Sequence, residues 1–380
     1  MQKQQRDYTS NDLVRVAKRE NNKKRTYLIV NPCQGKHIPV SPAVANEVFD
    51  LLGQKVNATV KEKEKVLVIA FAETATAIGA GIARNINQEV SYIQTTREDV
   101  EGAEYLYFSE SHSHATEQRL VKNGLKELLQ QVDKIVFAED EVTTGNTICN
   151  LIRELETLSG GKTYQYVIAS LLNGMTKEVE NSFKENQREV LYLIKTDNAQ
   201  YEQMVDKFVY DGLLLRKSEE NTIGKIPVIQ IGNKSNPRKL VSSKEYEMDC
   251  KEFASEVMKQ ISIKEHSKVL VLGTEEFMYP ALCVAREIEQ AAGNGYVSFH
   301  ATTRSPILTC SHSGYPLSSR IELRSLYEEE RCTYVYNLKK YEQVLLITDA
   351  RVQGESSLNT VLHALETAGN TNIMLVEWRN

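Results

Sequence analysis

The hydrophobic positions along residues 134–155 change period part-way, which indicates a strand followed by a helix. The first group is an unbroken apolar run, typical of a strand buried on both faces of a parallel sheet: Ile135, Val136, Phe137 and Ala138. The second group recurs at i, i+3, i+4 and i+7, the spacing of one helix face: Ile148, Leu151, Ile152 and Leu155. We therefore predict a buried strand and an amphipathic helix, joined by a polar connection.

Upstream segments show the same alternation of strand and helix patterns. Residues 66–70 are all apolar and predict a second buried strand, and the small residues over 79–83 indicate the start of a tightly packed helix. The segment SYIQTTRED predicts a strand that closes in Thr95, Thr96 and Arg97. Near the start of the chain, the segment YLIV predicts a strand shortly before Gly35. Such alternation is typical of an α/β fold with a parallel sheet.

Three acids and a hydroxyl-rich loop lie between the first strand and its helix. The acids are Glu139, Asp140 and Glu141, and the loop comprises Thr143, Thr144, Gly145, Asn146 and Thr147. Amides at a helix N-terminus, together with the helix dipole, favour a phosphate. Adjacent acids would repel a bare phosphate, whereas a ribose 5-phosphate suits both groups because its hydroxyls donate to carboxylates. The alternative is that these are solvated acids before an ordinary helix cap.

The composition narrows the class of protein. A chain of 380 residues is long enough for about two domains. With 26% charged and 41% hydrophobic residues and a net charge of −5, it has a globular composition and no basic bias toward nucleic acid. The six cysteines show no zinc-ligand spacing, so reduced thiols and a cytoplasmic location are expected. Neither a signal peptide nor a membrane span is indicated by the sequence.

The acidic segment resembles a known family motif. VFAEDEVTTGNT is similar to the phosphoribosyl-pyrophosphate (PRPP) motif of type I phosphoribosyltransferases, whereas a P-loop would need Lys after Gly145. The segments GKHIPVSP, FAETATAIG, TTRE and SHSHA further resemble the orotate-phosphoribosyltransferase-related group from tellurium-resistance gene clusters, over residues 24–215. The resemblance implies a Rossmann-like parallel sheet with helices on both faces and a hood.

The resemblance also implies roles for the residues near the acids. Glu139 and Asp140 would hold the ribose hydroxyls, Asp140 would also lie at the metal, and residues 143–147 would bind the 5-phosphate. The turn expected against pyrophosphate and Mg²⁺ comprises Phe71, Ala72, Glu73 and Thr74.

Further basic residues are assigned to the hood and the acceptor side. Arg97, His112 and His114 would neutralise the departing pyrophosphate, with the two histidines in a mobile hood loop. A zinc site at these histidines is an alternative, although further ligands at suitable spacing are missing. Lys36 and His37 are candidates for acceptor binding. The alternative for all of these basic residues, on the pyrophosphate side and the acceptor side, is simple solvation in exposed loops.

The second half of the sequence echoes the first. KVLVLGTEEFMYPALCVAREI parallels KVLVIAFAETATAIGAGIARNI at an offset of 203 residues, SFHATTRSP parallels YIQTTRED at 207, and VLLITDARVQGESS parallels IVFAEDEVTTGNT at 209. These ordered matches suggest a duplication, and chance similarity between strand-helix units is the alternative. Thr348 replaces Glu139, and Val352 and Gln353 replace two loop threonines. Catalysis is therefore not expected in the second copy.

The segment TRSP at residues 303–306 resembles the signature of the TRSP domain, which follows this phosphoribosyltransferase type. This resemblance covers residues 235–380 and makes Arg304 a candidate for acceptor binding or regulation. The predicted organisation is a polar, helical extension over 1–23, a phosphoribosyltransferase domain over 24–215, a linker over 216–234 and a smaller α/β TRSP domain over 235–380.

The implied function is a Mg²⁺-dependent phosphoribosyltransferase that joins a base-like acceptor to PRPP and releases pyrophosphate, in a tellurium-resistance or stress-linked pathway. Purine-specific members often carry an acid at the position of Thr143, so a different acceptor is expected. A homodimer with small-molecule partners is expected. One alternative is a PRPP-binding regulatory protein without catalysis. Another is a tandem pyrophosphokinase, whose intact motif lies in the later copy instead.

Overall fold

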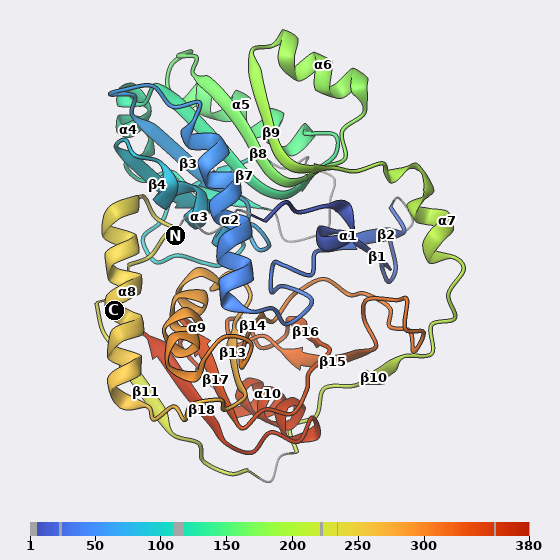
Figure 1. Cartoon of the computed structure of the whole chain (residues 1–380). Coiled ribbons are helices and arrows are strands. Elements are labelled where there is room, and N and C mark those ends of the chain that lie inside the picture. Colours follow the sequence, from blue (N-terminus) through green and yellow to red (C-terminus); the bar gives the residue numbers. More distant parts are fainter. Residues whose placement is uncertain are drawn as a thin grey trace. The chain divides into compact units, whose positions relative to one another are not determined.

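A computed structural model of the chain describes residues 6–22, 25–108, 118–220, 223–233, 235–352 and 355–379. The chain forms two compact units, each assembled from segments that are separate in the sequence. The first unit comprises Asn46–Thr196 and Lys234–Glu252. The second unit comprises Met1–Ala45, Asp197–Asn233 and Phe253–Asn380. Each unit has its own parallel sheet, which confirms the predicted α/β fold class (Figure 1).

The first unit is built on a six-stranded sheet in the order β12-β4-β3-β7-β8-β9 (Figure 1). Its strands are β3 (Val66–Ala70), β4 (Val90–Gln94), β7 (Lys134–Val142), β8 (Gln165–Asn173), β9 (Arg188–Lys195) and β12 (Val241–Ser242). Its helices are α2 (Pro42–Asn57, beginning in the second unit), α3 (Thr76–Asn85), α4 (Leu125–Gln131), α5 (Asn146–Leu158) and α6 (Lys177–Glu185). Neighbouring strands are parallel except β12, which is antiparallel to β4.

A short antiparallel hairpin, β5 (Tyr105–Tyr107) with β6 (Arg119–Val121), belongs to the same unit. The segment expected to form the hood loop, including His112 and His114, falls within 109–117 and so lies outside the described residues.

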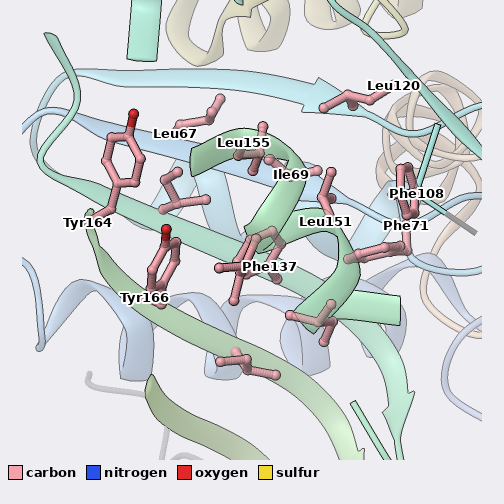
Figure 2. Packing of buried hydrophobic residues seen from close by; sticks show 14 of the residues in the cluster. Leu67, Ile69, Phe71, Phe108, Leu120, Phe137, Leu151, Leu155, Tyr164 and Tyr166 are labelled. Atoms are coloured by element: carbon pink, nitrogen blue, oxygen red, sulfur yellow. The ribbon is translucent and has the colours of Figure 1, made fainter. Parts of the chain in front are cut away.

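A hydrophobic core on one face of this sheet supports the ends of β3 and β7 (Figure 2). Phe71, the first residue after β3, packs edge-on against Phe108 with ring centroids 6.0 Å apart. Phe71 also contacts Phe137 of β7, with centroids 6.3 Å apart. Leu151 and Leu155 of α5 join the same cluster, as their helical spacing predicts. The two chain segments that follow β3 and β7 are therefore held by shared apolar contacts.

Two glycines allow α3 to lie close to its neighbours. A Cβ atom at Gly79 would stand 2.4 Å from the Cβ of Ala70, and one at Gly81 would stand 2.7 Å from the Cβ of Phe49. Real Cβ atoms do not approach so closely, so larger residues would force the helix away. The tightly packed helix predicted from the small residues over 79–83 is confirmed.

The second unit contains a five-stranded parallel sheet in the order β11-β18-β17-β13-β14. Its strands are β11 (Val228–Ile231), β13 (Val269–Gly273), β14 (Val297–Ala301), β17 (Gln343–Thr348) and β18 (Ile373–Trp378). Smaller sheets pair β1 (Arg15–Lys18) with β2 (Tyr27–Val30), and join β10 (Leu213–Leu215), β15 (Ser319–Arg324) and β16 (Cys332–Tyr336). Its helices are α1 (Ser10–Leu13), α7 (Tyr201–Val205), α8 (Ser243–Gln260, beginning in the first unit), α9 (Tyr279–Ala292) and α10 (Glu355–Thr367).

The strand order of the two main sheets supports the predicted repeat. The order β4-β3-β7-β8 in the first unit has its counterpart in β14-β13-β17-β18 in the second unit. The connection after the second strand of each copy also repeats, because Thr96 bridges Arg119 and Thr303 bridges Tyr334, both antiparallel. Two unrelated strand-helix units would not be expected to share both this strand order and this additional bridge, so the structure favours a duplication over chance similarity.

Individual hydrogen bonds repeat as well. In the first unit, the Thr95 hydroxyl accepts a hydrogen bond from the Ala72 amide at 2.8 Å. In the second unit, the Thr302 hydroxyl accepts one from the Glu275 amide at 3.0 Å. Each threonine directly follows its strand, and each amide belongs to the loop after the neighbouring strand. The two units therefore share the local construction of this loop.

The structure differs from the predicted linear division in two places. The region expected as a helical extension over 1–23 contains only a four-residue helix among its described residues, and it also contains β1, which pairs with β2. The region expected as a linker over 216–234 contains β11, which adds to the sheet of the second unit beside β18. Sequence composition did not show these pairings because the single partner of each strand, β2 for β1 and β18 for β11, lies outside the short polar segment. The predicted boundaries themselves stay a prediction.

Candidate functional site

The candidate site of the first unit lies where β3 and β7 end. The chain passes from β3 through α3 to β4 on one side, and from β7 through α5 to β8 on the other. Ligands of open α/β sheets bind at such a divergence, outside the carboxyl ends of the strands. The sequence placed its acids and its phosphate loop after these two strands, so the fold brings the predicted segments together.

The acids belong to β7 itself, which corrects the expectation that the strand ends at Ala138. The register of β7 with β3 runs to the pair Ala70–Ala138, whereas its register with β8 continues to Val142–Asn173. Residues 139–142 therefore extend past the end of β3 while β8 still supports them. This one-sided extension places the carboxylates on a rigid strand beside the loop that follows β3.

Burial dominates the electrostatics of the acidic pair. Glu139 and Asp140 are partly buried. Burial raises the pKa of Glu139 well above its usual range, and the charge of Asp140 adds to this effect. Burial also raises the pKa of Asp140, with a further contribution from Glu141, although the Thr74 hydroxyl donates to Asp140 at 3.0 Å and opposes the shift. Both carboxyl groups are therefore harder to ionise here than in water.

The predicted phosphate loop opens α5 as expected. Gly145 precedes the helix with a φ of +69°, and an added Cβ would stand 2.3 Å from the ring of Phe183. Glycine is therefore required here for both the backbone and the space. Thr144 and Asn146 are exposed, and the Asn146 amide lies 3.4 Å from the Thr144 hydroxyl. An exposed amide-rich turn of this kind suits an oxyanion.

The loop after β3 is fixed by hydrogen bonds at both ends. The Phe71 amide donates to the carbonyl of Ala138 at 3.0 Å, which ties the loop to β7 directly before the acids. The Ala72 amide donates to the Thr95 hydroxyl, and the Ala72 carbonyl accepts from the Gln118 side chain at 2.8 Å. The peptide bond between Ala72 and Glu73 is cis. Residues 71–74, predicted against pyrophosphate, are thus placed beside Asp140.

Three polar residues near this site were not named from the sequence, Gln118, Ser170 and Asn173, and Thr95 was named only at the end of its strand. Thr95 and Gln118 brace the loop after β3, and Ser170 lies opposite Glu139 in the register of β8. Ser170 and Asn173 are fully buried, and among the described residues the Ser170 hydroxyl and the Asn173 Nδ2 atom have no hydrogen-bond partner. The available signal was the presence of Ser and Asn in the otherwise apolar strand YVIASLLN.

The remaining predicted residues lie away from the acidic pair in the sequence. Arg97 is partly buried and follows Thr96, in the same unit as the acids. Lys36, His37 and Arg304 belong to the second unit. Lys36 and His37 are 0% and 2% exposed, so the alternative that they are solvated loop residues is wrong.

Arg304 is not a surface residue either, contrary to the simplest expectation for a lone arginine. Its side chain is 11% exposed, and its Nε atom lies 2.6 Å from a carboxylate oxygen of Glu275. The acceptor-side roles of Lys36, His37 and Arg304 stay predictions.

In the described ranges, no group of three His, Cys, Asp or Glu side chains is close enough to hold a metal unaided. The zinc alternative at His112 and His114 lies outside the described residues. No helix in the described part of the chain is both long and apolar enough to cross a bilayer.

Comparison with known families decides the class of the first half of the chain. Residues 13–199 match the family described as phosphoribosyl transferase. These residues form a phosphoribosyltransferase domain. Residues 240–365 match the TRSP domain, described as C-terminal to that transferase. The resemblance to a phosphoribosyltransferase followed by a TRSP domain is therefore confirmed.

Several solved structures are similar to this one. Adenine phosphoribosyltransferase from Rhodothermus marinus DSM 4252 has 13% identity, covers 49% of this chain and 96% of that chain, and has a TM-score of 0.33. Orotate phosphoribosyltransferase from Aeropyrum pernix has 16% identity over 47% and 85% of the two chains, with a TM-score of 0.29. With TM-scores this low, these similarities support no inference about substrate. No curated protein sequence matches the chain.

Proposed function

We propose that the first unit transfers the 5-phosphoribosyl group of PRPP to a base-like nitrogen nucleophile. The observation that carries this proposal is that an acidic pair and an exposed helix N-terminus lie on the same strand-helix connection. In addition, Asp140 accepts a hydrogen bond from Thr74 of the neighbouring loop. The match of residues 13–199 to the phosphoribosyl transferase family supports it independently.

The reaction breaks the bond between C1 of the ribose and the oxygen of pyrophosphate, which leaves with the electron pair. The acceptor nitrogen supplies the electron pair of the new bond to C1 and loses a proton. Positive charge develops on the ribose ring as the old bond breaks. Ionised Glu139 and Asp140 would stabilise that charge while they accept hydrogen bonds from the ribose hydroxyls.

Mg²⁺ fits the donor set at this position. It prefers oxygen ligands and is commonly held by one or two carboxylates together with substrate phosphates and water, so a three-residue cage is unnecessary. Asp140 would hold the ion, and a bound cation would favour the ionised form of a carboxyl whose pKa burial now raises. The ion would supply positive charge against the phosphate oxygens.

The two loops would divide the anionic groups of PRPP between them. Residues 143–147 would receive the 5-phosphate at the start of α5, and residues 71–74 would lie against pyrophosphate. Arg97 would neutralise charge on pyrophosphate as it leaves. Gly145 is central to this arrangement because its φ of +69° shapes the turn from which the amides of α5 project.

Release of pyrophosphate is the direct test. The full-length protein is incubated with PRPP, Mg²⁺ and a panel of bases and cell metabolites, and pyrophosphate is quantified. We expect release with at least one acceptor, and its loss in Asp140→Asn. Glu127→Gln provides a matched acid-to-amide control, because Glu127 is exposed on α4 of the same unit.

The outcomes separate this proposal from a purely regulatory role. PRPP binding without release by any acceptor of the panel would favour a binding protein that lacks catalysis. Failure to bind PRPP at all would contradict both. The tellurium-linked pathway, the homodimer and the cytoplasmic location stay predictions that this assay does not address.

A further inference from the structure

The loop after β13 in the second unit is the counterpart of the loop after β3. At the offset of 203 residues, Glu275 stands where the first unit has Ala72, and Glu276 stands where it has Glu73. Both carboxylates are only 1% exposed. The second copy therefore places a buried acid where the first copy has a methyl group.

Basic and hydroxyl groups converge on the carboxylate of Glu275. One of its oxygens, Oε2, accepts from Arg304 Nε at 2.6 Å and from Arg331 Nη1 at 2.8 Å. The other oxygen, Oε1, accepts a hydrogen bond from the Ser325 hydroxyl. Lys36 Nζ, fully buried, donates to the Glu275 carbonyl at 2.7 Å. Two guanidinium groups and a hydroxyl around one carboxylate form the donor set of an oxyanion site.

The counterparts of the ribose acids are also engaged internally. Asp349, which corresponds to Asp140, accepts a hydrogen bond from the Tyr327 hydroxyl at 2.5 Å. Thr348, which corresponds to Glu139, accepts from the Thr274 hydroxyl at 2.8 Å. Both corresponding positions of the second unit therefore accept side-chain hydrogen bonds from within that unit.

We propose that the Glu275 carboxylate is a built-in anion that occupies an oxyanion-binding pocket in the second unit. The pocket, formed by the side chains of Arg304, Arg331 and Ser325, accepts a small external oxyanion such as phosphate or formate once that carboxylate is removed. The comparison with a pyrophosphate loop rests on the proposed function of the first unit, whereas the pocket itself rests on the contacts of Glu275.

Because the Glu275 carboxylate is buried with its partners, its removal is expected to be costly. Removing one partner of a buried ion pair leaves uncompensated charge, which is far more costly than losing an exposed pair. Without the Glu275 carboxylate, the nearly buried guanidinium groups of Arg304 and Arg331 would lose the oxygen that they share. An external oxyanion can take the place of that oxygen.

Chemical rescue tests the proposal in the full-length chain. Glu275→Ala removes the carboxylate, and we expect its melting temperature to fall by about 10 °C. Inorganic phosphate or formate at 50–100 mM should then raise it by at least about 3 °C more than in the wild type, measured against chloride at equal ionic strength. No difference between variant and wild type would overturn the proposal.

Two further variants keep the test decisive. Glu275→Gly removes the same carboxylate at a residue with a φ of +46°, where glycine is favoured, so it provides a second background if the alanine variant does not fold. Glu328→Ala removes an exposed carboxylate that pairs with the same Arg331. It should lose little stability and show no specific response to phosphate or formate.

The readout is independent of PRPP chemistry. If the wild type released no pyrophosphate, the proposed function would fail while the anion response of Glu275→Ala could still be measured. Conversely, absence of rescue in both position-275 variants would overturn the built-in anion and leave the first-unit proposal intact.

Discussion

At the scale of single residues, the carboxyl groups proposed to bind PRPP lie where burial opposes their ionisation. Glu139 and Asp140 lie side by side on β7, and burial raises the pKa of both carboxyl groups. Each pKa unit corresponds to about 1.4 kcal/mol of unfavourable difference between ionised and neutral forms. Residues that weaken the fold in this way are common at functional sites, where the charge serves binding or catalysis.

The first prediction concerns Asp140→Asn. We expect turnover to fall at least about 100-fold, because an ionised group near the developing charge is lost. The ligand-free protein should be equally or more stable, by on the order of 1 kcal/mol at pH 7. A carboxyl with a raised folded pKa favours the folded state when protonated, and this contribution is lost as pH rises through that pKa. Melting temperatures of variant and wild type should therefore converge below the usual aspartate pKa of 3.8. Unfolding of the variant at pH 7 would show that Asp140 is structural.

The second prediction concerns Gly145→Ala. The positive φ costs about 1 kcal/mol for alanine, and the contact with the Phe183 ring adds about 1–3 kcal/mol. Affinity for PRPP should fall because the turn before α5 must shift. Gly160→Ala is the matched control, since Gly160 has a φ of +80° with nothing within 4 Å of an added Cβ. Equal unfolding free energies and PRPP affinities in the two variants would argue against a packed phosphate turn.

At the scale of secondary-structure elements, the spacing of apolar residues predicted the strands and helices that depend mainly on local sequence. The strand over 66–70 and the buried face of α5 follow directly from apolar spacing. The continuation of β7 to Val142 was missed because its partner β8 is a separate segment, and strand pairing overrides the polar character of residues 139–141. The burial of Lys36 was missed for a similar reason, since the Glu275 carbonyl that accepts its hydrogen bond lies 239 positions away.

The third prediction compares Thr95 and Thr302, whose hydroxyls accept equivalent backbone hydrogen bonds in the two units. Thr95→Val leaves the buried Ala72 amide without its acceptor, which should cost about 1–3 kcal/mol of unfolding free energy and weaken PRPP binding. Thr302→Val removes the equivalent acceptor from the Glu275 amide. It should cost a similar amount but leave PRPP affinity unchanged. Denaturant unfolding and PRPP titration of both variants provide the measurement, and a reversed pattern of affinities would place the ligand in the other unit.

At the scale of the whole molecule, the two units share one strand order but differ in the residues at their corresponding loops. Both units keep the same strand order and the same brace on the first loop. Only the first unit combines adjacent acids with a Thr/Gly turn at a helix start, whereas the second unit pairs its corresponding groups internally. Sequence repeats predicted the common architecture. They did not reveal the internal pairing, because Arg331 and Tyr327, which complete it, fall outside the matched segments.

The last prediction is that the chain binds one PRPP molecule, in the first unit. Calorimetric titration of the full-length protein with PRPP and Mg²⁺ should give one site per chain. Asp140→Asn should weaken that binding at least about tenfold, because a carboxylate hydrogen bond to the ribose contributes roughly 1.5–3 kcal/mol. Asp349→Asn, at the corresponding position of the second unit, should leave both affinity and stoichiometry unchanged, since the Asp349 carboxylate is already engaged by Tyr327. Two sites per chain, or a loss of PRPP affinity in Asp349→Asn with none in Asp140→Asn, would show that the second unit is a working site and that its internal contacts yield to the ligand.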